Sequence, residues 1–266
     1  MPRMDNEQNA PIDEAAAHER SAASSQAEAA AQPAATPQSD AAPQPGAAAS
    51  APESEAAQPP AFKVVLASGS PRRRELLERE GIRFIVHASE VDEALEPDLL
   101  ADPPEACKKL AERKAGAVVQ EILADPEFAG MLIVLGADTM VVHEGEIFGK
   151  PRNLSDATRM LRRLSGDTHQ VVTAVSVWMV ATNAEGQVSL GFRTFADEAH
   201  VTFHELTDER IAAYLKCGES FDKAGAYAAQ GEGAKLIARI EGDRDTVIGL
   251  PVTRLLREFP DLAAAR

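Results

Sequence analysis

Residues 63–77 read KVVLASGSPRRRELL, and this stretch decides the fold class. Its first five residues, KVVLA, form a short apolar run that predicts a buried strand. Ser70 can cap the helix that follows, and Pro71 suits its first position, where the missing N–H costs nothing. Gly81 is a natural stop for this helix. A strand, a tight turn and a helix in this order indicate an α/β protein.

Three arginines, Arg72, Arg73 and Arg74, crowd the first turn of this predicted helix. The positive pole of the peptide dipole lies at that end, so cations there are normally disfavoured. A glycine-containing turn before a helix also presents free backbone N–H groups to an anion. Ser68 adds a hydroxyl, and guanidinium groups suit phosphate oxygens. The pattern favours phosphate binding over a solvated basic turn, although it is neither a Walker A loop nor a dinucleotide fingerprint.

Further along the chain, strands and helices alternate, with hairpins between them. A helix is expected after Asp102, running to about Leu123. Strands over 170–180 and 191–203 are expected to form a hairpin with an extended loop, because about ten mostly polar residues separate them. The other predicted elements are strands at 131–142, 235–242 and 246–250, a helix over 153–166 capped by Ser155, a helix over 207–218 capped by Thr207, and a terminal helix opened by Pro251. This order predicts an α/β fold with a mixed sheet.

The first 61 residues differ in composition from the rest. Within residues 1–60 there are 20 alanines and 9 prolines, no Val, Leu, Phe, Tyr or Trp, and a net charge of −7. Such a segment cannot bury enough apolar surface to offset its ordering entropy, so residues 1–61 are expected to be a disordered, acidic Ala/Pro-rich extension. Residues 62–266 are expected to form the folded domain.

Several classes of protein are disfavoured by composition. The start of the chain has no apolar core of a secretory signal, and no apolar run approaches the roughly 18 residues of a membrane span. Cys107 and Cys217 lack metal or redox spacing, which suits the thiols of a cytoplasmic protein. The formal charge of −15 argues against general nucleic-acid binding, because phosphates would be repelled. We therefore expect no membrane and no nucleic-acid partner.

An aspartate interrupts an apolar strand in LGADTMVV. A lone buried carboxylate is expensive, so Asp138 needs a metal, a cation or a poised water, unless it caps a neighbouring loop. Gly136 beside it would permit close approach of a ligand. The loop ASEVDE offers Glu93 among acidic neighbours, which are either solvated or ligands for Mg²⁺ or Mn²⁺.

Other candidates carry positive charge or an amide. Lys114 lies on or beside the apolar stripe of its helix, where lysines usually extend to solvent. Lys150 ends a strand in EIFGKP, and Gln230 lies between flexible ends in the loop SFDKAGAYAAQGEG, where its amide could read a base edge. His169 is interpreted as structural. The cations together could neutralise a polyphosphate, while Asp138 and Glu93 could hold a metal and activate water.

Five blocks, VVLASGSPRRRELL, SEVDE, LGADTMVV with EIFGKP, LSGDTHQVVTAV, and DKAGAYAAQGEG with VIGLP, closely resemble the Maf family of nucleoside triphosphate pyrophosphatases. The resemblance runs from about Val64 to Phe259. It implies a two-lobed α/β fold around a deep cleft and, usually, a homodimer. It also implies hydrolysis of a nucleoside triphosphate to the monophosphate and pyrophosphate with a divalent cation, Mg²⁺ or Mn²⁺.

The resemblance also implies roles for individual residues. Asp138 matches the general base, and Glu93 the acidic position near the metal. The phosphate-cleft positions are matched by Ser68, Arg73, Lys114 and Lys150, and the positions that separate subfamilies by Arg72, Thr139 and Gln230. Arg, Thr and Gln at those positions resemble the dTTP/UTP branch, which could act on modified pyrimidine triphosphates as well. The alternative is a non-catalytic nucleotide-binding regulator of cell division or septum formation.

Overall fold

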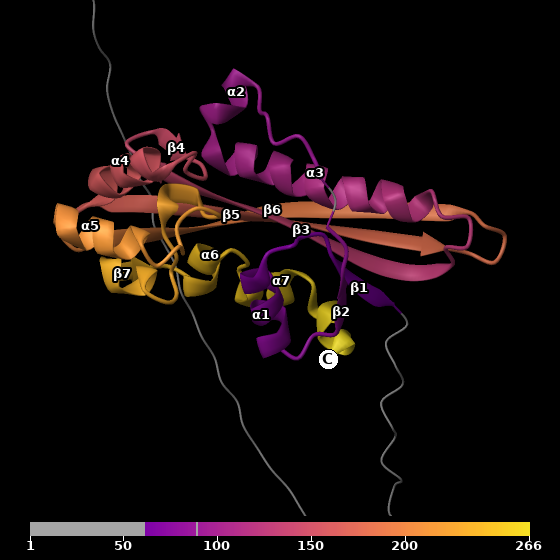
Figure 1. Cartoon of the computed structure of the whole chain (residues 1–266). Helices are drawn as coiled ribbons and strands as arrows, with labels where there is room; N and C mark the ends of the chain where they lie inside the picture. Colours follow the sequence, from indigo (N-terminus) through magenta and orange to yellow (C-terminus); the bar gives the residue numbers. More distant parts are fainter. Residues whose placement is uncertain (1–61, 89) are drawn as a thin grey trace, which may run out of the picture. The chain divides into compact units, whose positions relative to one another are not determined.

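One mixed β-sheet organises the residues that the computed structural model describes, 62–88 and 90–266 (Figure 1). The predicted disordered extension over 1–61 lies outside the described residues. The sheet has the strand order β2-β1-β3-β5-β6-β7, with β4 paired to β3. Its strands are β1 (Lys63–Leu66), β2 (Phe84–Val86), β3 (Gly130–His143), β4 (Glu146–Phe148), β5 (Thr168–Thr182), β6 (Val188–Phe203) and β7 (Ile237–Glu241).

The sheet combines two kinds of strand pairing. β1 runs parallel to both β2 and β3, as expected when the connections pass through helices. All other pairs are antiparallel, and β5 and β6 form the predicted hairpin. The expected extended loop is wrong, because both strands continue to a short turn and pair as far as Thr182 opposite Val188. The α/β class with a mixed sheet is therefore confirmed.

Helices cover both faces of this sheet. In Figure 1, α3 (Pro103–Leu123) lies on one face, while α1 (Pro71–Arg79), α6 (Arg244–Ile248) and α7 (Val252–Glu258) lie on the other. The remaining helices are α2 (Pro97–Leu100), α4 (Leu154–Leu164) and α5 (Asp208–Leu215), with the 3₁₀ turns η1 (Ala224–Ala226), η2 (Gly233–Leu236) and η3 (Pro260–Ala265). No helix among the described residues has the length and apolarity that crossing a membrane requires.

The contact between α3 and β3 is unusually close at Gly136. A Cβ atom on this glycine would lie 2.5 Å from the carbonyl oxygen of Ala111 and 2.7 Å from the backbone nitrogen and Cβ of Ala115. The expectation that Gly136 admits a ligand is therefore wrong, because the backbone of α3 fills that space. The close approach sets the distance between the next residues of β3 and the side chains of α3.

Some predicted helix ends and one predicted strand differ from the structure. Ser70 precedes α1 but makes no side-chain capping bond, and α4 is capped by Asn153 rather than by Ser155. The predicted strand over 246–250 is wrong, since it mostly belongs to α6, whose first turn is capped by the side chain of Asp243. Thr207 caps α5 as predicted, by accepting a bond from the backbone N–H of Arg210.

Candidate active site

The site lies where β3 loses one of its neighbours. β1 pairs with β3 as far as Leu66 opposite Leu135, and β4 resumes pairing on that edge at Phe148 opposite Val141. The edge of β3 between these points is open, and ligands of open α/β sheets commonly bind beyond the carboxyl end of a strand such as β1. Adjacent strand residues point to opposite faces, so the gap exposes both faces of β3 to one hollow.

A cavity of about 830 Å³ occupies this gap. It brings together all but one of the residues proposed from the sequence. Those that line it are Ser68, Arg72, Arg73, Glu93, Lys114, Asp138, Thr139 and Lys150. Gln230 is not among its lining residues, although its neighbour Ala229 is, so base reading by Gln230 stays a prediction.

Two carboxylates and a lysine meet on the α3 side of the cavity. The Nζ atom of Lys114 lies 2.6 Å from Oδ1 of Asp138 and 2.7 Å from Oε1 of Glu93. Asp138 is buried, and Lys114 is only 17 % exposed, so the pair is shielded from bulk water. Of the two interpretations of Lys114, a lysine extended to solvent or a cation of the site, the structure favours the second, because its ammonium supplies the cation that a buried carboxylate requires.

The ion pair changes the proton affinity of its members. Burial alone would lower the pKa of Lys114, but the negative charge of Asp138 and the bonds to both carboxylates outweigh burial and raise it. The hydrogen bond from Lys114 lowers the pKa of Glu93 against the opposing effect of burial. Lys114 is therefore a fixed cation at neutral pH.

The buried thiol of Cys107 supports Asp138 from behind. Its Sγ lies 3.2 Å from the backbone oxygen of Asp138 and 3.5 Å from that of Val172, and its single proton can be donated to one of them at a time. Burial, reinforced by the charge of Asp138, raises the pKa of Cys107, so it remains a neutral thiol. Cys107 thus acts as a donor that holds the strand rather than as a nucleophile.

Arg73 occupies the opposite wall. Its Nε donates to the carbonyl oxygen of Gly249 at 2.8 Å, Nη1 to Oγ of Ser68 at 3.0 Å, and Nη2 to Oγ1 of Thr139 at 3.3 Å. Burial lowers the pKa of Arg73, partly offset by the charge of Asp138, and a guanidinium remains charged at physiological pH. The arginine of the first helical turn is thus held by α1, β3 and the turn after α6.

The cavity is also lined by Asp222 and Lys223, two charged residues that were not proposed from the sequence. Arg72 contacts Asp222 at 3.3 Å, and Lys223 contacts the same carboxylate at 2.5 Å. The side chain of Lys223 is only 13 % exposed and lines the cavity. The DKAGAY block was visible as a motif, and a lysine in a motif of small residues was the signal for a further cation.

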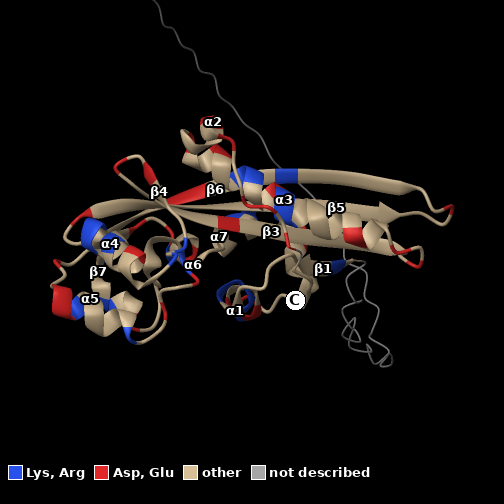
Figure 2. Cartoon of the chain, turned by 45° about the horizontal axis from the view of Figure 1, so that its top comes forward, with Lys and Arg blue, Asp and Glu red and all other residues tan. Residues whose placement is uncertain are grey.

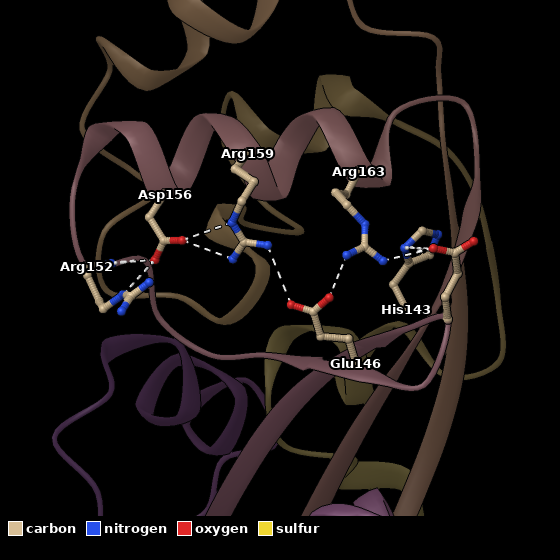
Figure 3. Close-up of polar contacts among 7 residues, drawn as sticks. His143, Glu146, Arg152, Asp156, Arg159 and Arg163 are labelled. Carbon is tan, nitrogen blue, oxygen red and sulfur yellow. Dashed lines mark hydrogen bonds and ion pairs between the residues drawn. The ribbon is translucent and has the colours of Figure 1, made fainter.

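A polar network anchors the segment that carries Lys150. Arg159 links Asp156 (3.0 Å) to Glu146 (3.5 Å), and Arg163 contacts Glu146 at 2.5 Å, as Figure 3 shows. Arg163 also contacts Glu144 at 2.8 Å. The network ties α4 to β4, which leads directly into Gly149 and Lys150. Lys150 is thereby carried to the cavity on a braced hairpin.

The acidic pair suits a magnesium or manganese ion of the kind that binds with its substrate. Within the part of the chain that the structure describes, no three His, Cys, Asp or Glu side chains gather as a ready-made metal site. Such ions are commonly held by one or two carboxylates plus substrate phosphates. Glu93 and Asp138 provide these two carboxylates on one wall of the cavity, so the donor set fits.

The charges that line the cavity differ from the net negative charge of the chain. Figure 2 shows basic and acidic residues together on α1 and α3, and acidic residues at the turn between β3 and β4. Five Lys and Arg side chains line the cavity against four Asp and Glu side chains, so the cavity has a small positive excess within an acidic chain. His169, by contrast, is buried against Tyr227 at 2.8 Å and does not line the cavity.

Comparison with known proteins identifies the family of this chain. Residues 63–262 match the family model described as Maf-like protein. A dTTP/UTP pyrophosphatase of Bacillus velezensis is 44% identical over 199 residues, covering 75% of this chain and 96% of that protein. One of Bacillus thuringiensis is 43% identical over 197 residues, covering 74% and 94%. A solved Mycobacterium abscessus nucleoside-triphosphatase / dITP/XTP pyrophosphatase matches at 12% identity and a TM-score of 0.32, covering 76% of this chain and 96% of that one. The family match covers nearly all of the described residues, and the chain belongs to the Maf family.

Proposed function

We propose that this protein hydrolyses dTTP and UTP to the nucleoside monophosphate and pyrophosphate, with modified pyrimidine triphosphates as further substrates. One observation carries the proposal: a buried carboxylate, Asp138, lies in the same cavity as Arg72, Arg73, Lys114 and Lys150. The relatives at 43–44% identity that are named dTTP/UTP pyrophosphatases support the choice of nucleotide.

The cations bind the triphosphate. Arg72 and Arg73 present planar donors that suit two phosphate oxygens at once, and the ammonium groups of Lys114, Lys150 and Lys223 act as point charges. Their charge is set in place before substrate arrives, because Arg73 and Lys114 are already hydrogen-bonded to the walls. Such preorganised cations stabilise the charge that builds on the phosphates in the transition state.

Asp138 is the proposed general base. Its Oδ1 accepts the bond from Lys114, and its Oδ2, whose neighbour is the Cys107 thiol with Sγ at 4.0 Å, is the oxygen that accepts a proton from a water molecule in the cavity. The water oxygen then bonds to the α-phosphorus while the bond from that phosphorus to the bridging oxygen breaks, and pyrophosphate leaves. A base positioned in this way typically contributes ~10²–10⁴-fold to the rate.

A divalent cation completes the proposal. Mg²⁺ or Mn²⁺ would be held by Glu93 and Asp138 together with phosphate oxygens, and it would neutralise phosphate charge. The proposal also includes a homodimer in the cytoplasm. The absence of a disulfide between Cys107 and Cys217 is compatible with that compartment.

The test is pyrophosphate release by the Asp138→Asn variant on a panel of nucleoside triphosphates with Mg²⁺ or Mn²⁺. Asparagine preserves the size of the side chain but cannot accept the proton, so kcat should fall ~10²–10⁴-fold. The affinity for dTTP, measured by calorimetry, should stay within about tenfold, because the cations remain.

The matched control is Asp208→Asn, which makes the same chemical change at the start of α5, in an exposed ion pair with Arg162 of α4. Its kcat should equal that of the unmodified protein. Retention of most of the rate by Asp138→Asn would exclude Asp138 as the base. Tight nucleotide binding by the unmodified protein with no pyrophosphate release would favour the non-catalytic regulator.

A further inference from the structure

A pair of threonines, the half-buried Thr139 on β3 and the buried Thr173 on β5, lies next to Arg73. Thr139 and Thr173 face each other across the two strands, with their hydroxyl oxygens 2.9 Å apart. Thr173 is fully buried, and its Oγ1 also lies 2.6 Å from the carbonyl oxygen of Thr246 in α6. Thr173 was not among the residues proposed from the sequence, and it does not line the cavity.

Counting protons fixes the direction of every bond in this chain. A carbonyl oxygen only accepts, so the single hydroxyl proton of Thr173 must point to Thr246. The contact between the two threonines is then favourable only if Thr139 donates to Thr173. The hydroxyl of Thr139 has no second proton, so it must act as an acceptor toward Arg73, whose Nη2 lies 3.3 Å away.

The far end of the chain is itself held in place. The hydroxyl of Thr246 donates to Oδ2 of Asp197 at 2.6 Å, and Arg254 contacts the other oxygen of that carboxylate at 3.0 Å. The carbonyl that receives the proton of Thr173 therefore belongs to a turn of α6 that is tied to β6. Its position does not depend on substrate.

The consequence concerns the donors that Arg73 offers to a phosphate. A guanidinium has five N–H groups. Three of those in Arg73 are used by Gly249, Ser68 and Thr139, which leaves one on Nη1 and one on Nη2. If Thr139 turned its proton toward Nη2, it would repel that nitrogen and misalign the remaining pair.

We propose that Thr173 is a positioning residue, which orients the hydroxyl of Thr139 as an acceptor and thereby aims the free N–H groups of Arg73 at the triphosphate. Thr139 then acts through Arg73 and does not donate a hydrogen bond to the nucleotide. This inference rests on the proposed function for its substrate, but its geometry concerns any polyphosphate in the cavity.

The experiment compares Thr173→Val, which keeps the shape of the side chain but has no hydroxyl, with Thr173→Ser, which restores it. We expect kcat/KM for dTTP to fall about tenfold to a hundredfold in Thr173→Val and to stay within about threefold of the unmodified protein in Thr173→Ser, as loss of a buried hydrogen-bonding partner predicts. Binding of inorganic triphosphate, measured by calorimetry without turnover, should weaken in the same order.

A double-mutant cycle with Arg73→Lys separates positioning from a general loss of packing. A lysine has no second nitrogen for Thr139 to align, so Thr173→Val should have little further effect on triphosphate binding in that background. If Thr173→Val does not fold, Thr139→Val can replace it in the cycle with Arg73→Lys, because it removes the hydroxyl that contacts Arg73. The control is Thr168→Val, which removes one hydroxyl of an exposed threonine pair (2.8 Å) on the same β5–β6 hairpin and should change nothing.

The outcomes are distinct. The positioning role would be overturned if Thr173→Val weakened triphosphate binding equally in the unmodified protein and in the Arg73→Lys variant. It would also be overturned if Thr173→Ser weakened binding as much as Thr173→Val. If the unmodified protein released no pyrophosphate but bound triphosphate in a Thr173-dependent way, the proposed reaction would fail while the positioning role would stand.

Discussion

At the scale of single residues, His169 couples the stability of the fold to pH. Its Nε2 lies 2.8 Å from the hydroxyl of Tyr227, and its ring packs edge-on against Phe203. Burial, with a smaller contribution from the charge of His143, lowers the pKa of His169 to about 3. The imidazole is therefore neutral in the folded protein near neutral pH.

The sign of the pH effect follows from proton binding. An unfolded histidine has a pKa near 6.5, so between about pH 6.5 and 3 the unfolded chain binds a proton that the folded chain does not. The free energy of unfolding should fall as the pH falls through this window, by up to about 1.4 kcal/mol per pH unit from His169. His169→Gln should lose this part of the slope.

Urea unfolding at a series of pH values from 4 to 7 measures the slope. His200→Gln is the control, because it removes an exposed imidazole from the neighbouring strand β6. An unchanged slope in His169→Gln would show that another group takes up the proton.

The residue scale also shows what chemistry can be inferred from a sequence. Asp138 was identifiable because an acid inside an apolar strand needs a partner. The role of its partner Lys114 was ambiguous. Helical spacing places Lys114 beside the apolar face of its helix, but it does not predict whether the ammonium group points to solvent or into the site. Thr173 could not be found, because a threonine inside a strand has no local feature that distinguishes a hydrogen-bond relay from ordinary packing.

At the scale of secondary-structure elements, the contact of α3 with β3 at Gly136 positions Lys114 against Asp138. Gly136→Ala would place a Cβ atom within 2.7 Å of three atoms of α3, two of them in its backbone, so the helix must move. We expect a loss of about 1–3 kcal/mol in the free energy of unfolding, as for overpacked sites, together with reduced pyrophosphate release.

Gly191→Ala provides the comparison, since Gly191 also lies in a strand but has no atom within 4 Å of the added Cβ. Its stability and activity should match those of the unmodified protein. Equal stability of Gly136→Ala and Gly191→Ala would mean that α3 adapts without cost.

The same scale explains which elements the sequence predicted. The hairpin of β5 and β6 was predictable because a long apolar run and a second strand-like run flank a polar segment, but the exposed residues that begin β6 were expected to belong to the loop. TVIGL was interpreted as a strand because a short apolar run looks alike in a buried strand and a buried helix. Asp243, which caps α6, was the local signal for a helix, but that signal competes with the β-branched residues that follow it.

At the scale of the whole molecule, a net charge of −15 is divided between two parts of the chain: residues 1–60 carry −7 and the remainder −8. The substrate is itself a polyanion. The net negative charge of the protein therefore repels the nucleotide, whereas the Lys and Arg side chains of the cavity attract it. All residues that line the cavity come from position 67 onward, and the family match begins at residue 63.

Removal of residues 1–61 should therefore leave the reaction unchanged and alter only the long-range field. Exposed charges are screened beyond about 8 Å at 0.15 M salt but reach roughly 30 Å at 0.01 M. At 0.15 M salt, we expect the KM for dTTP of the shortened chain to agree with that of the full-length chain within about twofold. At 0.01 M salt, the KM of the shortened chain should be lower, because less negative charge repels the nucleotide. Equal unfolding temperatures would show that the shortened chain is intact. A fall in kcat on removal would instead assign residues 1–61 a part in the site, and the cavity alone would no longer account for the activity.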